Sequence, residues 1–351
     1  MAKQLTPRER LKLTLAHKQP DRPPVRIDYT KEVQTVLSAY FKEKFGDEDI
    51  ARILNIDFRY VSPQRIKVQK QKEETALLHG MYQDVTLKPL AWIKTMDDVC
   101  KFQPAINPDE FNYQNIGNMC AANDPFIRTL GDPGQFDIVN GLGARGIGLE
   151  DMICAIMTED PVVVALIDKH LANNYEFLRR CLEAGGGMIE IVHIGEDCGN
   201  QRSPLFPPEF FKRFFAPRMK RFADLAHNFG AACMLHSCGS VRDILNILIK
   251  DVGIDIHDAC QPEPSGMAPA GLKRDFGGRI TFCGMLSLQK TLPYGTPEDC
   301  RKEAEFLIKE AGKKGGYIFS PPNTITNDVP LENILAIYEA VTGKDLRQPV
   351  R

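Results

Sequence analysis

The sequence lacks an excess of charge of either sign. It holds 44 lysines and arginines against 46 aspartates and glutamates, so its formal net charge is only −2. This balance excludes the strongly basic surface with which nucleic-acid-binding proteins neutralise phosphates. The densest basic run, residues 65–72, is interrupted by apolar and glutamine residues, which is typical of a solvated face.

Long apolar runs are also missing, and the first ten residues are mostly polar or charged. No segment approaches the roughly 20 apolar residues that a membrane-spanning helix needs. The N-terminal stretch has no apolar run of the kind that a signal peptide contains. We therefore expect a cytoplasmic protein that has neither a membrane nor a nucleic acid as its partner.

Paired cysteine motifs are absent, although the chain contains ten cysteines. No Cys-x-x-Cys occurs, and the cysteines are scattered along the sequence. A reducing compartment disfavours disulfides, so each cysteine is expected to be a core residue, a metal ligand or a nucleophile. Most are expected in the core, because a free cysteine behaves as a small apolar side chain.

Short apolar segments alternate with helical patterns over most of the chain. Eight strands are predicted, at residues 25–29, 57–61, 135–139, 188–194, 231–236, 254–258, 280–283 and 317–320. Strands that alternate with helices indicate a parallel sheet, and eight of them favour an α/β fold of the (β/α)8 TIM-barrel type. We expect one domain over residues 1–351, with an N-terminal helical extension capped at Thr6 and an insertion within residues 64–125.

One glycine-rich stretch, Gly141-Leu-Gly-Ala-Arg-Gly146, matches the GxGxxG pattern of dinucleotide-binding proteins. It lies in the middle of the chain, and no βαβ half precedes it. The acidic residue expected about 20 positions later is not clearly placed. We therefore interpret the stretch as a glycine-rich loop or the start of a helix.

A barrel of this type places its active site at the carboxyl ends of its strands. Those predicted ends carry the following groups: Asp28 and Tyr29; Glu196, Asp197 and Cys198; His236 and Cys238; His257, Asp258 and Cys260; Cys283; Ser320 and Asn323. Imidazole and thiolate ligands suit Zn²⁺, which keeps one open position when it is catalytic. The sequence therefore predicts a zinc site at this rim.

The pair His236 and Cys238 gives the strongest indication of that site. Strand side chains alternate with period two, so both residues point the same way. Cys283 or Cys198 is expected as a third ligand. Each residue also has a structural alternative, because His236 could be a core histidine and either of the other two cysteines could simply pack in the interior.

The other groups at the strand ends are assigned to catalysis and to substrate binding. Asp197 and Glu196 could complete the metal site, orient a ligand or act as general acids. Asp28 could instead cap the helix that follows it. The residues assigned to substrate binding are Asp28, Tyr29, His257 and Asn323.

Several motifs together resemble a known family. They are Thr6-Pro-Arg-Glu-Arg with Pro20-Asp-Arg-Pro, Gly195-Glu-Asp-Cys-Gly-Asn-Gln, His236-Ser-Cys-Gly-Ser, Leu292-Pro-Tyr-Gly-Thr-Pro-Glu-Asp and Asp328-Val-Pro-Leu-Glu-Asn. With these motifs the chain resembles the uroporphyrinogen decarboxylase-like superfamily over nearly its whole length, which implies a (β/α)8 barrel. The arginine-rich motif that binds substrate carboxylates in true uroporphyrinogen decarboxylases is not present, and its place is taken by Arg26-Ile-Asp-Tyr-Thr30.

The sequence is more similar to the methyltransferase branch, whose members pass methyl groups to or from a corrinoid protein. In that branch, zinc bound by His-x-Cys and a later cysteine activates a thiol or the heteroatom that bears the methyl group. His236 and Cys238 match the first two positions. The later cysteine of the coenzyme M methyltransferases lies in a Pro-Gly-Cys turn, where this chain has Pro321-Pro-Asn-Thr, so Asn323 replaces it.

The resemblance therefore implies a zinc-dependent methyltransferase of the O-demethylase type. It would move a methyl group from a small methylated substrate, such as a methyl aryl ether, to the Co(I) of a corrinoid (cobalamin) carried by a partner protein. One alternative is a decarboxylase or other lyase that needs no metal, with Arg26, Arg59 and Arg145 converging on its pocket. Another is a non-catalytic barrel that binds a corrinoid protein. The phenylalanines of residues 210–215 would lie in the core or at a homodimer interface.

Overall fold

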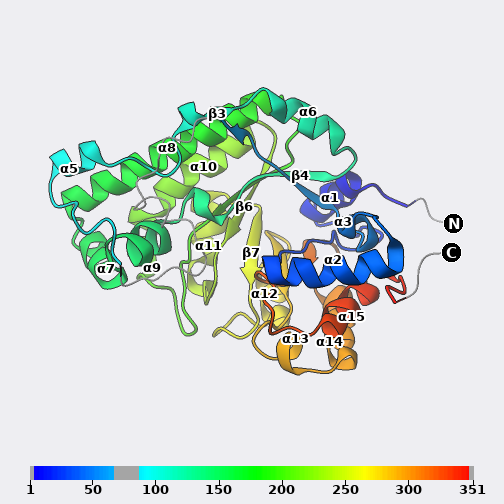
Figure 1. Cartoon of the computed structure of the whole chain (residues 1–351). Helices are drawn as coiled ribbons and strands as arrows, with labels where there is room; N and C mark the ends of the chain where they lie inside the picture. The colour runs from blue at the N-terminus through cyan, green and yellow to red at the C-terminus, as the bar shows by residue number, and fades with distance from the viewer. Residues whose placement is uncertain (1–3, 67–86, 348–351) are drawn as a thin grey trace.

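The computed structural model describes residues 4–66 and 87–347, which form a curled parallel sheet surrounded by helices (Figure 1). Seven strands pair in parallel in the order β1-β4-β5-β6-β7-β8-β9. Their bounds are β1 Phe58–Val61, β4 Ile127–Gly131, β5 Ile191–Gly195, β6 Ala232–His236, β7 Ile256–Cys260, β8 Thr281–Met285 and β9 Tyr317–Ser320. The predicted α/β fold of the TIM-barrel type is confirmed.

Residues 24–29 lie between the two edge strands of this sheet, β9 and β1. The Arg26 N–H donates to the Phe319 carbonyl of β9 at 2.9 Å, and the Asp57 N–H, just before β1, donates to the Val25 carbonyl at 2.8 Å. The predicted first strand is thus an extended segment with isolated bridges, not a regular ladder. It occupies the position of the eighth strand and closes the sheet toward a barrel.

The third predicted strand, residues 135–139, is wrong, because the strand at this place is β4, earlier in the chain. Arg128 interrupts the apolar pattern of β4, yet it is buried, because its guanidinium donates to the Glu190 carboxylate. Residues 138–147 form the helix η4 (Ile138–Ile147), a π-helix that contains the whole GxGxxG stretch. Of the two interpretations of that stretch, a glycine-rich loop or the start of a helix, the helical one is closer to the structure, in which the stretch lies inside a helix.

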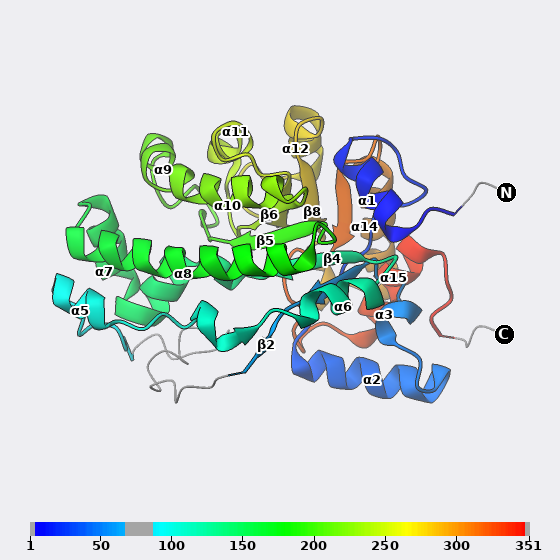
Figure 2. The same cartoon turned by 90° about the horizontal axis from the view of Figure 1, so that it is seen from above.

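Helices cover the outer face of the sheet, and the long helices α8 and α10 run beside β5 and β6 in the view from above (Figure 2). The α-helices are α1 Pro7–Leu15, α2 Lys31–Phe45, α3 Ile50–Ile53, α5 Met96–Lys101, α6 Asn115–Ala122, α7 Leu149–Met157, α8 Pro161–Gly185, α9 Pro208–Phe214, α10 Ala216–Asn228, α11 Leu245–Ile247, α12 Pro269–Phe276, α13 Thr291–Tyr294, α14 Pro297–Glu310 and α15 Leu331–Thr342. Short turns of other helix types are η2 Pro108–Glu110, η3 Pro133–Gln135, η5 Arg242–Ile244 and η6 Leu248–Val252.

Other sequence expectations can be compared with these elements. The capping box at Thr6 is confirmed. The insertion contains a two-stranded antiparallel ladder of β2 (Gln64–Arg65) and β3 (Phe111–Asn112). All four phenylalanines of residues 210–215 are buried within the chain, so they belong to its core. Within residues 4–66 and 87–347, every helix is too short or too polar to cross a membrane.

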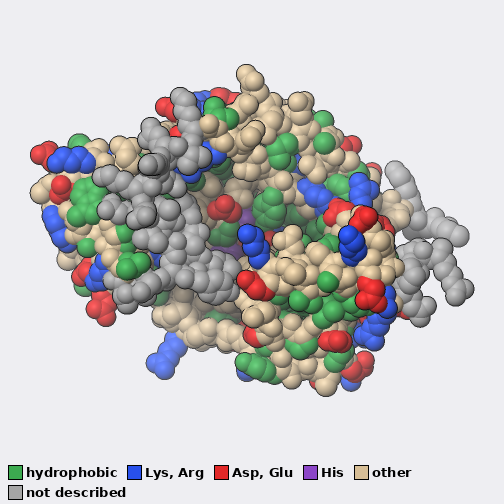
Figure 3. Space-filling view, in the orientation of Figure 1, with side chains coloured by type: hydrophobic (Ala, Val, Ile, Leu, Met, Phe, Trp, Pro, Cys, Tyr) green, Lys and Arg blue, Asp and Glu red, His purple; other side chains and the backbone are tan. Residues whose placement is uncertain are grey.

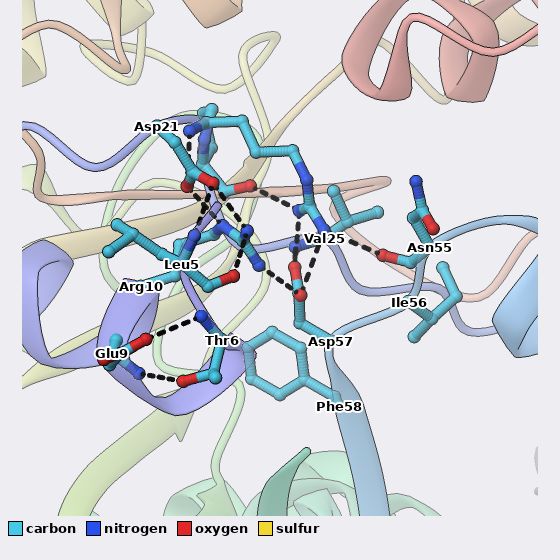
Figure 4. Close-up of polar contacts among 12 residues, drawn as sticks. Leu5, Thr6, Glu9, Arg10, Asp21, Val25, Asn55, Ile56, Asp57 and Phe58 are labelled. Atoms are coloured by element: carbon cyan, nitrogen blue, oxygen red, sulfur yellow. Dashed lines mark hydrogen bonds and ion pairs between the residues drawn. The ribbon is translucent and has the colours of Figure 1, made fainter. Parts of the chain in front are cut away.

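A buried ion-pair network holds the amino end of β1 to helix α1 (Figure 4). Arg10 of α1 is 1% exposed and donates to Asp21 at 2.7 and 2.9 Å and to Asp57 at 2.7 Å. The same Asp57 carboxylate accepts from the Arg22 guanidinium and from the Val25 N–H at 2.7 Å. The network lies at the amino ends of the strands, where barrel residues serve stability and not catalysis.

Candidate active site

A cavity of about 1150 Å³ opens at the carboxyl ends of the strands. Figure 3 shows it as a hollow near the centre of the face, with acidic and histidine side chains inside. Its walls come largely from the ends of six sheet strands, the segments that follow them and the extended segment at Arg26, and include Tyr60, Gly195, His236 and Asn323. The cavity therefore occupies the place where barrels of this type carry their active sites.

His236, the last residue of β6, is held in one orientation at the floor of the cavity. Its Nδ1 lies 3.0 Å from Oδ2 of Asp258, on the neighbouring strand β7. Although burial opposes ionisation, Arg26 and two histidines hold the pKa of Asp258 well below its usual range. An ionised Asp258 accepts the Nδ1 proton, and Nε2 faces the Cys238 sulfur. Although burial opposes a positive charge, the contacts with Asp258 and Cys238 raise the pKa of His236 well above its usual range, so a metal ion at Nε2 would replace a proton.

Cys238, Asp197 and His236 bring one sulfur, one oxygen and one nitrogen atom together, all within 4.8 Å of one another. The His236 Nε2 and the Cys238 sulfur are 3.6 Å apart. Asp197 is oriented by the Cys238 N–H, which donates to it at 2.8 Å, and by the Asn140 amide at 2.7 Å. The Asn323 amide donates to the Cys238 sulfur at 3.3 Å. These four contacts place the three donor atoms around one point.

This donor set fits a zinc ion. Cysteine, histidine and aspartate are the ligands that Zn²⁺ takes in proteins, and a histidine ligand commonly donates its second nitrogen to a carboxylate. Burial raises the pKa of the Cys238 thiol, so the sulfur keeps its proton unless a cation replaces it. A second group of three donors, His193, His236 and Asp258, shares His236 with the first.

Asp258 is expected to control metal affinity through His236. In the Asp258→Asn variant, zinc binding should weaken by about 10- to 100-fold, because a neutral amide no longer fixes the Nδ1–H tautomer. Competition with a chromophoric chelator measures this affinity. Asp255→Asn is the matched control, since Asp255 pairs with His227 at 2.8 Å outside the cavity. An unchanged affinity in Asp258→Asn would show that this contact does not orient the ligand.

The two cysteines expected as a third ligand lie outside both donor groups. The Cys198 thiol donates to the Glu196 carbonyl at 3.2 Å, and the residue is 3% exposed. The Cys283 sulfur is fully buried beside the Arg26 guanidinium, at 3.8 Å. The structure therefore brings Asp197, and neither cysteine, next to His236 and Cys238.

Glu196 lines the cavity, but its carboxylate is occupied by backbone. It accepts from the Ile138 N–H at 2.7 Å and from the Val139 N–H at 3.0 Å, at the start of η4. Burial, together with the nearby Asp137, raises its pKa well above the usual range. Glu196 thus anchors the helix that carries Asn140, the partner of Asp197.

The predicted substrate-binding residues divide into two groups. Asp28, Tyr29 and Asn323 line the cavity. His257 does not, because it lies one position before Asp258 on β7 and so points to the other face of the sheet. It is fully buried against Phe282, and burial lowers its pKa to about 4.

Three residues of the site were not found from the sequence. His193 lies on β5 two positions before Gly195, so period-two alternation could have pointed to it. Tyr60 is the second-last residue of β1, a correctly predicted strand, so its place at a strand end could have pointed to it. Asn140 follows the wrongly predicted third strand, so its approach to Asp197 could not be foreseen.

Fold and site together define a TIM-barrel-like α/β protein with a histidine, cysteine and carboxylate cluster at the carboxyl ends of its strands. A family model described as uroporphyrinogen decarboxylase (URO-D) matches residues 138–343, which is more than half of the chain. The chain therefore belongs to the URO-D family. The expected membership of the superfamily is confirmed.

One solved structure supports the same fold. A methyltransferase from Methanosarcina mazei matches with a TM-score of 0.60 and 18% identity, covering 97% of this chain and 99% of the other. At this identity the likeness shows the fold alone. The 3-keto-D-glucoside 4-epimerase from E. coli matches with a TM-score of 0.42 and 13% identity over 67% of this chain and 85% of its own, which is too low to carry an inference. No curated protein sequence matches the chain.

Proposed function

We propose that this protein is a zinc-dependent methyltransferase that moves a methyl group from a small methylated substrate to the Co(I) of a corrinoid protein. The observation that carries the proposal is the convergence of the His236 nitrogen, the Cys238 sulfur and the Asp197 carboxylate inside the cavity. The likeness of the whole fold to the methyltransferase from Methanosarcina mazei agrees with it. The cytoplasm remains the compartment that we expect for both partners.

Zinc held by these three groups would act as a Lewis acid on the heteroatom that carries the methyl group. His236 would bind through Nε2, because Asp258 holds its Nδ1–H. The Asn323 amide, already directed at the Cys238 sulfur, would stabilise negative charge on that atom. Asp197 is pre-oriented by two hydrogen bonds, so little conformational entropy would be lost when it binds.

In the proposed reaction, the bond between the methyl carbon and the substrate heteroatom breaks, and the heteroatom keeps the bonding pair. The methyl carbon forms a bond to the partner's Co(I), which supplies two electrons. With a methyl aryl ether as substrate, the leaving group is a phenolate, whose conjugate acid has a pKa of about 10, and it then takes up a proton from water. Such a group leaves poorly, and each tenfold gain in rate needs about 1.4 kcal/mol of stabilisation of the developing charge.

The metal-free lyase is less well supported, because it needs guanidinium groups that are available to bind substrate carboxylates. Arg26 is paired with Asp28 and Asp258, and Arg145 with Asp137. Arg65, also in the cavity wall, is paired with Glu110. Arg59 lies outside the described cavity wall and packs on the Phe126 ring. These pairings count against the lyase.

Purified protein loaded with zinc should convert cob(I)alamin to methylcobalamin when methyl aryl ethers, methylamines or methyl thioethers are supplied. The absorbance change of the cobalamin measures this reaction, and metal analysis should find about one zinc per chain. Bound zinc without turnover on any of these donors would support the non-catalytic barrel instead. Absence of zinc together with release of CO₂ from a carboxylated substrate would support the lyase.

A further inference from the structure

Tyr60, at the end of β1, presents its hydroxyl to the cavity in an unusual setting. The Arg26 guanidinium donates to the Tyr60 oxygen from Nε at 3.1 Å and from Nη2 at 2.9 Å. Two donors therefore occupy the acceptor side of the oxygen, and the hydroxyl hydrogen is directed away from Arg26. Within residues 4–66 and 87–347, no side chain or carbonyl accepts that hydrogen.

Arg26 can hold Tyr60 in place because its own side chain and backbone are bound by other residues. It is 4% exposed, and its Nη1 donates to Asp258 at 2.8 Å. Asp28 forms a second ion pair with it, and the Tyr338 hydroxyl donates to its carbonyl at 2.9 Å. The guanidinium thus joins Tyr60 to Asp258, whose other oxygen contacts His236 of the proposed metal site.

The Tyr60 hydroxyl keeps its proton at neutral pH. The residue as a whole is 43% exposed, but its hydroxyl is bonded to the guanidinium of Arg26, which is only 4% exposed. Burial raises the pKa of Tyr60, and the nearby Arg26 charge opposes this only in part. A departing phenolate, with a conjugate-acid pKa of about 10, would therefore accept a hydrogen bond from Tyr60 without removing its proton.

We infer that Tyr60 is a catalytic hydrogen-bond donor to the substrate atom that leaves with the bonding electrons, and that this atom is an oxygen. The inference rests on the proposed function and narrows its substrate class to methyl ethers. As the methyl–oxygen bond breaks, negative charge grows on oxygen and strengthens the Tyr60 hydrogen bond. The methyl group goes to Co(I), and the released oxygen anion takes its proton from water.

A donor aimed at developing charge contributes mainly in the transition state. In the Tyr60→Phe variant, kcat for an unactivated methyl aryl ether should fall by about 100-fold, as when one oxyanion donor is removed elsewhere. KM should change less than kcat, because the neutral ether oxygen of the ground state is a weak acceptor. Zinc content should stay at the wild-type level, since Tyr60 is no part of the donor cluster.

Rates measured with a series of methyl donors distinguish a catalytic role of Tyr60 from a structural one. The ratio of wild-type to Tyr60→Phe rates should be largest for ethers of weakly acidic phenols. It should shrink for ethers of nitrophenols, which carry less charge on oxygen, and approach one for a quaternary methylammonium donor, which leaves as a neutral amine. A ratio that is the same for all donors would overturn the inference, because a distorted cavity slows every donor alike.

A binding measurement keeps the inference testable if no donor is turned over. A nitrophenol bound to the wild-type protein should titrate, by absorbance, about one pH unit lower than in Tyr60→Phe, because Tyr60 stabilises the bound phenolate. Equal titration in both proteins would overturn the inference. Failure of methyl transfer combined with the expected shift would overturn the proposed function alone. Tyr294→Phe is the matched control, since that tyrosine is 82% exposed and lies outside the cavity wall.

Discussion

Replacing Cys238 with serine should remove bound zinc and lower methyl transfer by more than about 100-fold. Changes in groups that only orient a metal ligand already cost about 10- to 100-fold in affinity or activity, so loss of the coordinating sulfur itself should cost more. A serine hydroxyl does not ionise near neutral pH and is a poor zinc ligand. Metal analysis after dialysis and the methylcobalamin assay measure the two effects.

Other cysteine variants show whether the effect belongs to this sulfur. Cys154→Ser changes an exposed cysteine on α7 and should keep both zinc and turnover. Cys283→Ser and Cys198→Ser should also keep zinc, because these sulfurs lie outside the donor cluster. Asp197→Asn should lower the zinc affinity, because Asp197 belongs to that cluster. A Cys238→Ser protein with full zinc and full activity would contradict the proposed metal site.

Replacing Asp57 with alanine should lower the free energy of unfolding by about 3–5 kcal/mol, which is the cost of breaking a buried ion pair from one side. Asp57 is 1% exposed and neutralises Arg10 and Arg22 while accepting the Val25 N–H. Without it, Arg10 keeps the Asp21 carboxylate and the Leu5 carbonyl as acceptors, and the buried Val25 N–H loses its acceptor. Urea denaturation followed by circular dichroism measures the change.

A surface pair provides the contrast for this stability effect. Asp224 and Lys220 form an exposed ion pair within helix α10, with both side chains about half exposed. Asp224→Ala should change the free energy of unfolding by less than about 0.5 kcal/mol, because exposed pairs in a helix contribute little. If Asp57→Ala and Asp224→Ala lowered the free energy of unfolding by similar amounts, burial of the network would not explain its contribution to stability.

Local sequence features predicted much of this molecule. Seven of the eight expected strands lie where their apolar runs indicated, with the first reduced to isolated bridges. The third strand was misplaced, because Arg128 made β4 look polar and only its pairing with Glu190 explains its burial. Asn140 follows the wrongly predicted strand, so its contact with Asp197 could not be predicted.

The site shows the same division between local and distant information. The spacing of His236 and Cys238 on one strand end placed two donors together, because alternation along a strand is a local property. The choice among Asp197, Cys198 and Cys283 depended on how the side chains at two other strand ends, those of β5 and β8, point. The spacing of residues within the sequence contains no information on how side chains of different strands point relative to one another.

The order of apolar and polar residues in this chain was enough to predict a parallel barrel, the end of it that carries the candidate site, and the pair His236 and Cys238. Only the tertiary structure decided that Asp197 joins that pair, that Asp258 orients His236 and that Arg26 turns the Tyr60 hydroxyl toward the cavity. The reason is physical: these contacts join segments up to 232 residues apart, such as Arg26 and Asp258, and their geometry follows from strand register, which closure of the sheet sets.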